Sequence, residues 1–514
     1  MRLRLIATSI AIFWAIGAVA SEPTPVQEPH DPASVQAPAP PLPTSASENT
    51  AAIEPPVAAT PSYVIEHIVV VGNRKTNRRV VERYLPFARG DNLSPDDVRI
   101  TRARFRLLGT GYFRTVDLSL RKGTRRGAID LVVNVEERNT IVVNDLWLGL
   151  AADASSDGRA RPLAGYGGAS VSENNFLGTG VGLTGALALA DRQLALRARV
   201  TDPNLFGSRW VFEFELLHNQ ARDFFGSRDV LVEGASSARD YASPEYRRTG
   251  GSISLGHDIG TSAQAFVGLR VEGITADLPK AASHVYGLEV QPIEFHLFRD
   301  NSYLSVLRTG IVYDTRDDAS LTSLGTHILG SADVAAGPLG SDYVYAKFSV
   351  RAAQYVPLKW NHTIKFEGFV GAVFGNAPLF ERFYVGDFTD FLPDRVLDLT
   401  FDRRSSPNFL NTSIVEQRYG EYAAKLQVEY RVPLYRGSKA LYGADAFASF
   451  GFFGVLQQRD LERSITGYNS GSRIPIDMTF NAGARFVFAI GTLQLGVSNF
   501  LSFLPVQASQ GAAQ

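Results

Sequence analysis

Several residue patterns in this 514-residue sequence could support enzyme chemistry, but each lacks the surroundings that the chemistry needs. Residues 180–185, "GVGLTG", have the glycine spacing of a dinucleotide site, yet strand-like sequence follows where the phosphate-binding helix should begin. The eight histidines show no spacing such as H-x-x-x-H, and neither a Gly-x-Ser-x-Gly elbow nor a P-loop occurs. Asp317 and Asp318 lie in a predicted turn, where carboxylates are ordinary. We predict no enzyme, no metal site and no cofactor.

The most unusual concentration of charge is in residues 381–404, "ERFYVGDFTDFLPDRVLDLTFDRR", where ten charged side chains stand among aromatics and leucines. This stretch is too charged for a core strand, too apolar for a linker, and lacks helical periodicity. Charges inside a polar lumen are tolerated when they are paired. We interpret the stretch as a loop inside a barrel, with its aromatics on the inner wall. An exposed surface loop is the alternative.

The composition favours an antiparallel β protein over a helical enzyme. Lys and Arg total 51 against 52 Asp and Glu, so the net charge does not indicate any class of binding partner. Glycine numbers 46, Phe and Tyr are 32 and 19, and Met is only 2, which is typical of many turns and aromatic girdles. Cysteine is absent, which excludes disulfides and thiolate metal sites.

The N-terminus carries an export signal. Arg2 and Arg4 give a positive start, and an apolar run of about 16 residues follows. The run ends on Ala-Val-Ala directly before Ser21, which is the small-residue pattern of a cleavage site. We predict a signal peptide over residues 1–20. The run is short for a bilayer-spanning helix, and an uncleaved anchor is the alternative.

Residues 21–62 are expected to be a disordered, proline-rich linker. They hold 11 of the 26 prolines, five acidic residues and no Lys or Arg. Such a stretch cannot bury enough apolar surface to offset chain entropy. A proline-rich ligand for a partner is the alternative.

A small α+β domain is predicted over residues 63–138. "YVIEHIVVVGN" reads as a strand, "TNRRVVERYLPF" and "SPDDVRITRARFRLLGTG" as helices, and "YFRTVDLSL" with "GAIDLVVNVEE" as a hairpin. Ser94 is the expected N-cap of the second helix, ahead of Pro95. One expected helix stripe comprises Val98, Thr101, Phe105 and Leu108.

The sequence after about residue 140 repeats one pattern, ten or so residues of alternation followed by a turn. In residues 210–216, for example, Trp and Phe share one face and Glu the other. With a signal peptide and no second long apolar run, a transmembrane β-barrel explains this best, apolar toward lipid and polar toward the lumen. A secreted all-β protein is the alternative.

We count fifteen candidate barrel strands, whereas such barrels normally have an even number, so about sixteen are expected. Short turns alternate with long loops at residues 220–245, 274–293, 374–418 and 455–475. Phe500 follows a typical terminal-strand sequence, but 14 further residues come after it. The predicted barrel covers residues 140–503, with a tail over residues 504–514.

The first domain resembles a POTRA domain, the periplasmic module that precedes outer-membrane transport barrels. The resemblance rests on "IVVVGN", "LLGTGYF" and "LVVNVEE". It implies capture of client chains by strand addition at an exposed edge, for which Val116 and Leu118 are the expected positions. The domain carries 16 Lys or Arg against nine Asp or Glu. A solvated basic face is one interpretation, and attraction to anionic lipid or an acidic partner is the other.

The barrel is similar to BamA/TamA-type assembly proteins of the bacterial surface antigen family. "NNFLGTG", "DPNLFG", "YDTRDD" and "EYRVPLY" carry this resemblance. It implies a lumenal loop whose Arg-Gly-Phe tip pairs with acids on the next two strands. Here "LPDRVLDL" stands in place of that tip, so Arg395 is the nearest substitute. Glu429 and Asp445 are the expected acidic partners, with Ser449 as a competing alignment for Asp445.

The resemblance implies a bacterial outer-membrane protein with its POTRA domain in the periplasm. The expected function is insertion or export of client polypeptides without nucleotide, through a weakened barrel seam and POTRA strand capture. The alternatives are a passive pore or surface receptor of the same architecture, and a secretion pore for a dedicated partner. Expected partners are the outer-membrane lipid bilayer, client β-barrel or secreted chains and periplasmic assembly proteins, and no nucleic acid.

Overall fold

The computed structural model describes residues 62–154, 159–225, 230–233, 241–260, 262–286, 289–318, 321–388, 395–401, 409–410, 412, 414, 419–437, 440–458 and 475–498. The expected signal peptide and C-terminal tail lie outside these residues, as does all of the expected linker except Ser62. Among the described residues, no helix has the length and apolar character required to span a membrane.

The N-terminal domain is a four-stranded sheet with two helices. Its elements are β1 (Tyr63–Val71), α2 (Arg78–Arg83), β2 (Asn92–Leu93), α3 (Val98–Gly109), β3 (Phe113–Lys122) and β4 (Ala128–Glu137). The strand order is β2-β1-β4-β3, with β1 parallel to β4 and the other pairs antiparallel. A separate hydrophobic core includes Ile65, Val81, Leu107 and Leu131.

Helix α3 begins later than the sequence predicts. Asp97 is its N-cap and accepts a hydrogen bond from the backbone N–H of Arg99 at 2.8 Å. Ser94 instead accepts, through its carbonyl, the N–H of Asp97 in the turn before the helix. The buried face contains Ala103 and Leu107. The expected stripe is therefore rotated, and Val98 and Phe105 are exposed.

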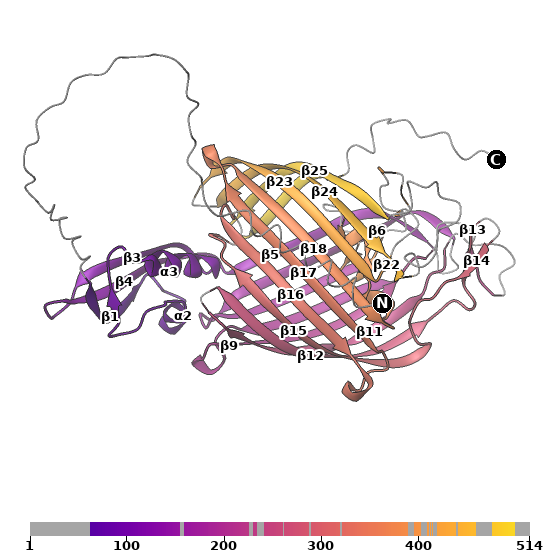
Figure 1. Ribbon diagram of the computed structural model, residues 1–514, viewed down its shortest axis with the longest axis horizontal. Coiled ribbons are helices and arrows are strands. Elements are labelled where there is room, and N and C mark those ends of the chain that lie inside the picture. Colours follow the sequence, from indigo (N-terminus) through magenta and orange to yellow (C-terminus); the bar gives the residue numbers. More distant parts are fainter. Residues whose placement is uncertain are drawn as a thin grey trace, which may run out of the picture. The chain divides into compact units, whose positions relative to one another are not determined.

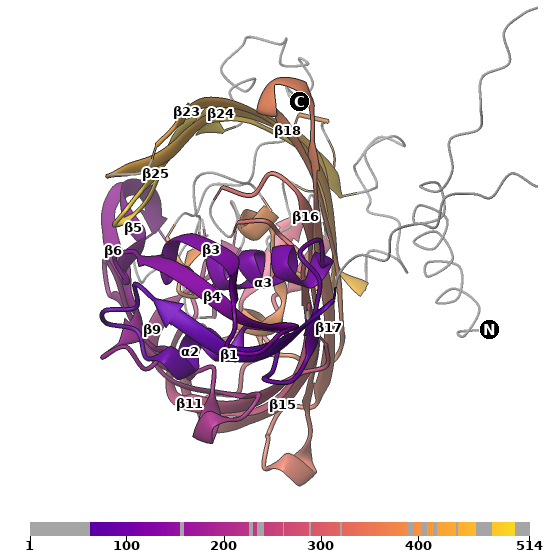
Figure 2. The ribbon, with the colours of Figure 1, turned by 90° about the vertical axis from the view of Figure 1, so that its left-hand side faces the viewer.

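In the described part of the chain, fifteen strands form a closed barrel, whose neighbours are antiparallel except at the β5–β26 closure. The sequence offered fifteen candidate strands, and about sixteen were expected. The barrel strands are β5 (Ile141–Ala154), β6 (Ala160–Phe176), β7 (Val181–Ala190), β8 (Gln193–Asp202), β9 (Trp210–Arg222), β11 (Glu245–Asp258), β12 (Ala263–Asp277), β15 (Asp300–Asp314), β16 (Gly325–Ala335), β17 (Tyr345–Pro357), β18 (Thr363–Gly375), β23 (Tyr422–Arg436), β24 (Leu441–Leu456), β25 (Ile476–Phe488) and β26 (Gly491–Ser498). The strands slant across the barrel in Figure 1 and form a ring in Figure 2. The mainly β fold with a small α+β domain is confirmed.

The two faces of the barrel wall differ in polarity. On β9, Trp210, Phe214 and Leu216 are exposed outward, whereas Glu215 and Asn219 are buried on the opposite face. Strands β12 and β17 repeat the pattern with exposed Val and Phe. Because side chains alternate along a strand, this places an apolar surface toward lipid and a polar surface toward the lumen.

Smaller elements lie in the connections between barrel strands. The three-stranded sheet β10-β13-β14 contains β10 (Val230–Leu231), β13 (Ser283–Tyr286) and β14 (Glu289–Pro292). Short 3-10 turns are η1 (Leu205–Gly207), η2 (Gly337–Leu339) and η3 (Lys359–Asn361). The longest connection with described residues, between β18 and β23, contains the functional-site candidates.

Candidate functional site

The described residues of the β18–β23 connection lie inside the ring of strands, and most of them are buried (Figure 2). Its described elements are η4 (Leu379–Glu381), β19 (Phe383–Tyr384), η5 (Val385–Phe388), β20 (Arg395–Val396), β21 (Leu399–Thr400) and β22 (Tyr419–Gly420). Phe380, Phe383 and Phe388 belong to the same hydrophobic cluster as wall residues such as Ala195 and Leu304. The aromatics of this charged segment therefore pack against the inner wall.

The described tip of the loop is a two-residue hairpin. Strands β20 and β21 pair Arg395 with Thr400 and Val396 with Leu399. The two residues between them, Leu397 and Asp398, have φ of 49° and 65°. Positive φ at both positions is the geometry of a tight type I′ turn. The turn presents a carboxylate at the tip.

Asp398 joins the loop tip to the barrel wall. Its Oδ2 accepts a hydrogen bond from Arg248 Nη1 of β11 at 3.2 Å and a shorter one from Arg197 Nη2 of β8. Nearby, the Asn219 side chain of β9 donates to the carbonyl of Leu397 at 2.8 Å. The tip is thus bound to three wall strands by one carboxylate and one carbonyl.

Glu381 forms a second anchor to the wall. Its carboxylate pairs with Arg270 of β12 and lies 3.6 Å from Lys347 Nζ of β17. Wall residue Glu272 connects the two anchors, because it accepts bonds from Arg248 Nε and Nη2 at 2.7 and 3.0 Å and lies 3.3 Å from Arg270 Nε. Glu272 is fully buried. Buried charges of this kind are stable only when paired and hydrogen-bonded.

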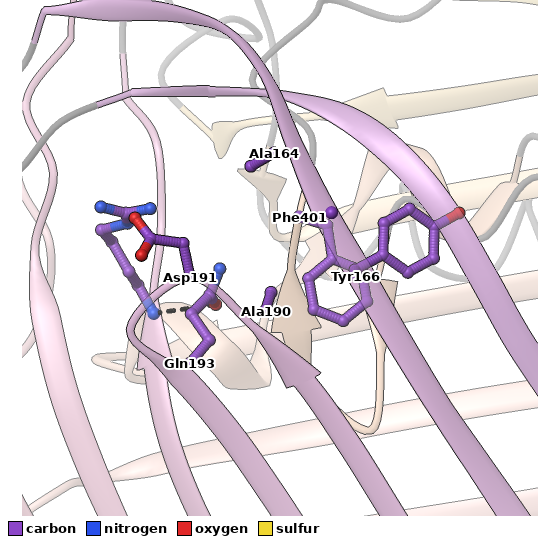
Figure 3. Close-up of a pocket in the computed structure, with 8 residues that line it drawn as sticks. Ala164, Tyr166, Ala190, Asp191, Gln193 and Phe401 are labelled. Atoms are coloured by element: carbon purple, nitrogen blue, oxygen red, sulfur yellow. Dashed lines mark hydrogen bonds between the residues drawn. The ribbon is translucent and has the colours of Figure 1, made fainter.

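The end of the hairpin also contacts β6 and β8. The ring of Phe401 stacks on Tyr166 with centroids 4.6 Å apart, and Gln193 Nε2 donates to the carbonyl of Thr400 at 2.9 Å. Gln193 Oε1 accepts the N–H of Arg222 at 3.2 Å (Figure 3). A small pocket lies here, lined by Ala164, Gly165, Tyr166, Ala190, Asp191, Gln193, Arg222 and Phe401.

The structure separates the three residues for which the sequence predicted one lumenal network. Arg395 pairs within the loop, with Asp387 Oδ2 at 2.8 Å. Glu429 pairs with wall residue Arg431, and Asp445 lies 2.7 Å from Arg436. The loop tip turns toward β8 and β11, whereas β23 and β24 pair their acids with bases on the wall itself. This differs from the sequence-based expectation.

Sequence reasoning missed the wall cations that hold the loop. No sequence pattern singles out Arg197, Arg248, Arg270 or Lys347 as a partner of the loop. The alternation of side chains along each strand does indicate that these four cations face the lumen. However, Arg197 and Asp398 are 201 residues apart, and no local pattern indicates that they meet.

The barrel closes through a narrow seam between β5 and β26. Among the described residues, one residue pair, Gly491 with Val143, joins them, and it is parallel. The N–H of Val143 donates to the carbonyl of Ile490 at 2.7 Å. The neighbouring pairs β25–β26 and β5–β6 have eight and twelve residue pairs. Most backbone groups facing the seam therefore lack a strand partner within the described barrel.

The N-terminal domain has an exposed strand edge. Strand β3 is the last strand of its sheet and pairs only with β4 among the described residues. The side chain of Val116 is fully buried, and that of Leu118 packs on the same core. These two side chains therefore hold β3 in place, while its outer backbone edge has no strand partner among the described residues.

Two family comparisons decide the class of this protein. Residues 175–391 match the Omp85 superfamily domain, and residues 63–138 match a POTRA domain described as a surface antigen variable number repeat. These matches coincide with the barrel and with the N-terminal sheet domain. The chain contains an Omp85 superfamily domain preceded by a POTRA domain. This Omp85 protein is of the BamA/TamA type, and it lies in the outer membrane with its POTRA domain in the periplasm.

Curated relatives carry outer-membrane assembly names. The Omp85 protein is 24% identical over 329 residues to the outer membrane protein assembly factor BamA of Nitratidesulfovibrio vulgaris, covering 63% of this chain and 36% of the relative. It is 26% identical over 156 residues to a putative outer membrane protein assembly factor of Treponema pallidum, covering 30% and 18%. The matches thus span little more than a third of the first relative and under a fifth of the second.

A solved structure shares the fold. CdiB from Escherichia coli superimposes with a TM-score of 0.52 at 10% identity, covering 85% of this chain and 72% of that one. At this identity the likeness concerns the fold alone.

Proposed function

We propose that this Omp85 protein inserts client β-barrels into the outer membrane or translocates client polypeptides across it, without nucleotide. The observation that carries the proposal is the seam of one residue pair between β5 and β26. An edge strand presents unpaired N–H and C=O groups that can pair with an incoming strand. Within the described barrel, opening this seam breaks far fewer ladder bonds than separating any other two neighbouring strands.

The POTRA edge supplies a first contact for the client. Strand β3 offers backbone pairing along ten residues, from Phe113 to Lys122. Chain connectivity supports transfer toward the seam, because β4 is followed by β5 after only three residues, 138–140. A strand captured at β3 would therefore be tethered near the strand that forms one side of the seam.

A crosslink across the seam tests the proposal. The chain contains no cysteine, so Leu146→Cys on β5 and Leu493→Cys on β26 can be joined selectively by bis-maleimides of graded length. Both side chains are exposed on the outer face. We expect cells that depend on the crosslinked protein to lose other barrel proteins, or exported chains, from the outer membrane.

The matched control joins two strands that are already fully paired. Leu269→Cys and Leu307→Cys are directly opposite on β12 and β15, and both are outward-facing. This crosslink should leave client abundance unchanged. If the seam crosslink is equally harmless, the seam is not the route of assembly and the proposal fails.

A passive pore or surface receptor is the second candidate. The observation that favours it is the lumenal loop, which has the charged tip Leu397-Asp398 where assembly proteins are expected to have Arg-Gly-Phe. Depletion separates the two functions. If this protein is an assembly or translocation factor, its loss lowers the abundance of other outer-membrane barrels or of exported chains. If it is a pore or receptor, their abundance stays normal.

A further inference from the structure

The cations that hold the lumenal loop belong to the wall, and one of them, Arg248, is fixed by a wall carboxylate independently of the loop. Arg248 is 1% exposed, and two of its guanidinium nitrogens are bound by Glu272 of the neighbouring strand. The third nitrogen, Nη1, is directed at Asp398 of the loop. A guanidinium fixed on one side and free to donate on the other is a preformed carboxylate site.

The wall around the two anchors has an excess of positive charge. Five cations and three carboxylates of the wall lie at the two anchors. Arg197 and Arg199 pair with Glu213 and Glu215, Arg248 and Arg270 share Glu272, and Lys347 pairs with Glu381 of the loop. This group of wall residues therefore carries an excess of two positive charges. Glu381 and Asp398 of the loop supply the two missing negative charges.

Aromatic rings accompany these carboxylates. The ring of Phe380, next to Glu381 in sequence, lies 3.9 Å from the Arg248 guanidinium. The ring of Phe383 lies 5.3 Å from Lys347 Nζ. A cation over an aromatic face gains further stabilisation where water is excluded. Each anchor thus recognises both a carboxylate and a nearby ring.

We propose that the lumenal wall of β8, β11, β12 and β17 is a binding site for acidic chain segments that carry an aromatic residue beside a carboxylate. The loop residues Phe380, Glu381 and Asp398 are its resident occupants, and an acidic–aromatic segment of another chain displaces them. The site takes an acidic segment because its own charge is positive without the loop. That the displacing segment belongs to a client rests on the proposed function, whereas the binding site itself does not.

Blocking of ion current by a peptide tests the site. The variant Glu381→Gln with Asp398→Asn weakens both anchors, so we expect its conductance in planar bilayers to exceed that of the unchanged protein. The peptide of residues 378–387, "PLFERFYVGD", should block the variant's current. The same peptide with Gln in place of its Glu should block the current equally only at a concentration at least about tenfold higher, because one charge-assisted bond is lost.

Substitutions in the wall locate the block. Lys347→Gln with Arg270→Gln should abolish the preference for the acidic peptide. Glu429→Gln, which removes a lumenal acid paired with Arg431 rather than with the loop, should leave both conductance and block unchanged. Equal block by the acidic and neutral peptides, or a preference that survives the wall substitutions, would overturn the proposal.

A second measurement serves if the double loop variant does not fold. The unchanged protein can be titrated with the fluorescent peptide while loop cleavage by added protease is followed. Displacement predicts faster cleavage of the loop with the acidic peptide and no change with the neutral one. Absence of any acceleration counts against the site. Failure of the seam crosslink experiment, by contrast, would remove the client function and leave this binding result standing.

Discussion

Asp398 and Arg248 meet across the barrel lumen at 3.2 Å, although 150 residues separate them in the chain. Arg197 donates to the same carboxylate oxygen. Removal of the carboxylate leaves two guanidinium groups near each other without their shared partner. Breaking a buried pair costs about 3–5 kcal/mol, and about 1 kcal/mol or less where water screens the charges.

Asp398→Asn should therefore lower the temperature at which the barrel unfolds on a heated gel and make the loop easier to cleave. Asp398 is about a third exposed, so we expect a loss of about 1–2 kcal/mol, between the buried and screened limits. The double variant Asp398→Asn with Arg197→Gln should lose less than the sum of the single losses. Strictly additive losses would show that the pair is not coupled.

Arg395 and Glu429 should behave independently, because they belong to separate ion pairs. Arg395→Ala combined with Glu429→Gln is expected to lower the unfolding temperature by the sum of the single shifts. Arg395→Ala combined with Asp387→Asn should fall short of the sum, because both changes break one pair. Coupling between Arg395 and Glu429 would instead favour the network expected from the family resemblance.

Gly72→Ala should destabilise the POTRA domain severely. Gly72 has φ of +93°, and an added Cβ would lie 1.9 Å from the carbonyl oxygen of Val135 on β4. Gly90 is the matched control, with φ of +95° and open space around its Cβ position. Left-handed strain alone costs about 1–2 kcal/mol, so Gly90→Ala should cost that amount and Gly72→Ala clearly more. Hydrogen exchange of the β4 amides measures the difference, and equal losses would contradict the steric explanation.

Glu137 makes the turn after β1 sensitive to pH. Partial burial opposes its ionisation, but bonds from the backbone N–H groups of Thr76 and Lys75, at 2.6 and 3.0 Å, outweigh this and lower the pKa of Glu137. A carboxyl whose pKa is lower in the folded state stabilises the fold above its unfolded pKa, about 4.3. The stabilisation is lost as the pH falls through the folded pKa.

The amide of Thr76 should therefore stay protected from hydrogen exchange at pH 7 and lose protection progressively in acid, after correction for the intrinsic exchange rate. Glu137→Gln should weaken the protection at pH 7 and abolish this part of its pH dependence. Unchanged protection in the variant would show that the carboxylate does not hold the turn.

Proline substitutions along β3 test client capture at the POTRA edge. Successive N–H groups of a strand point to opposite sides, so Leu118→Pro and Ser119→Pro remove donors on different edges. The variant that removes a donor facing β4 should destabilise the domain. The other should leave the domain folded but lower the outer-membrane level of client proteins. Normal client levels with both variants would exclude β3 as a required capture edge.

The local sequence pattern was sufficient to predict those structural features that depend only on residues close together in the chain. The alternation in residues 210–216 assigns the two faces of β9, because side-chain direction in a strand reverses at every residue. Gly72 follows β1 in the POTRA signature, and its close approach to β4 explains why a glycine stands there. The start of α3 was misplaced because Ser94 and Asp97 are both good caps, and only the turn between them decides which one serves.

The sequence by itself therefore determined the fold class, the approximate number of barrel strands and the charged character of the lumenal loop, because each of these follows from periodicity and composition. Only the tertiary structure decided which charges meet. The loop tip reaches β8 and β11 rather than β23 and β24, so Asp398 pairs with Arg197 and Arg248 while Arg395 pairs within the loop. Strand alternation directs a side chain into the lumen, but it carries no information about which strand lies opposite a loop. That depends on the closure of the whole barrel and on where the packed aromatics place the hairpin.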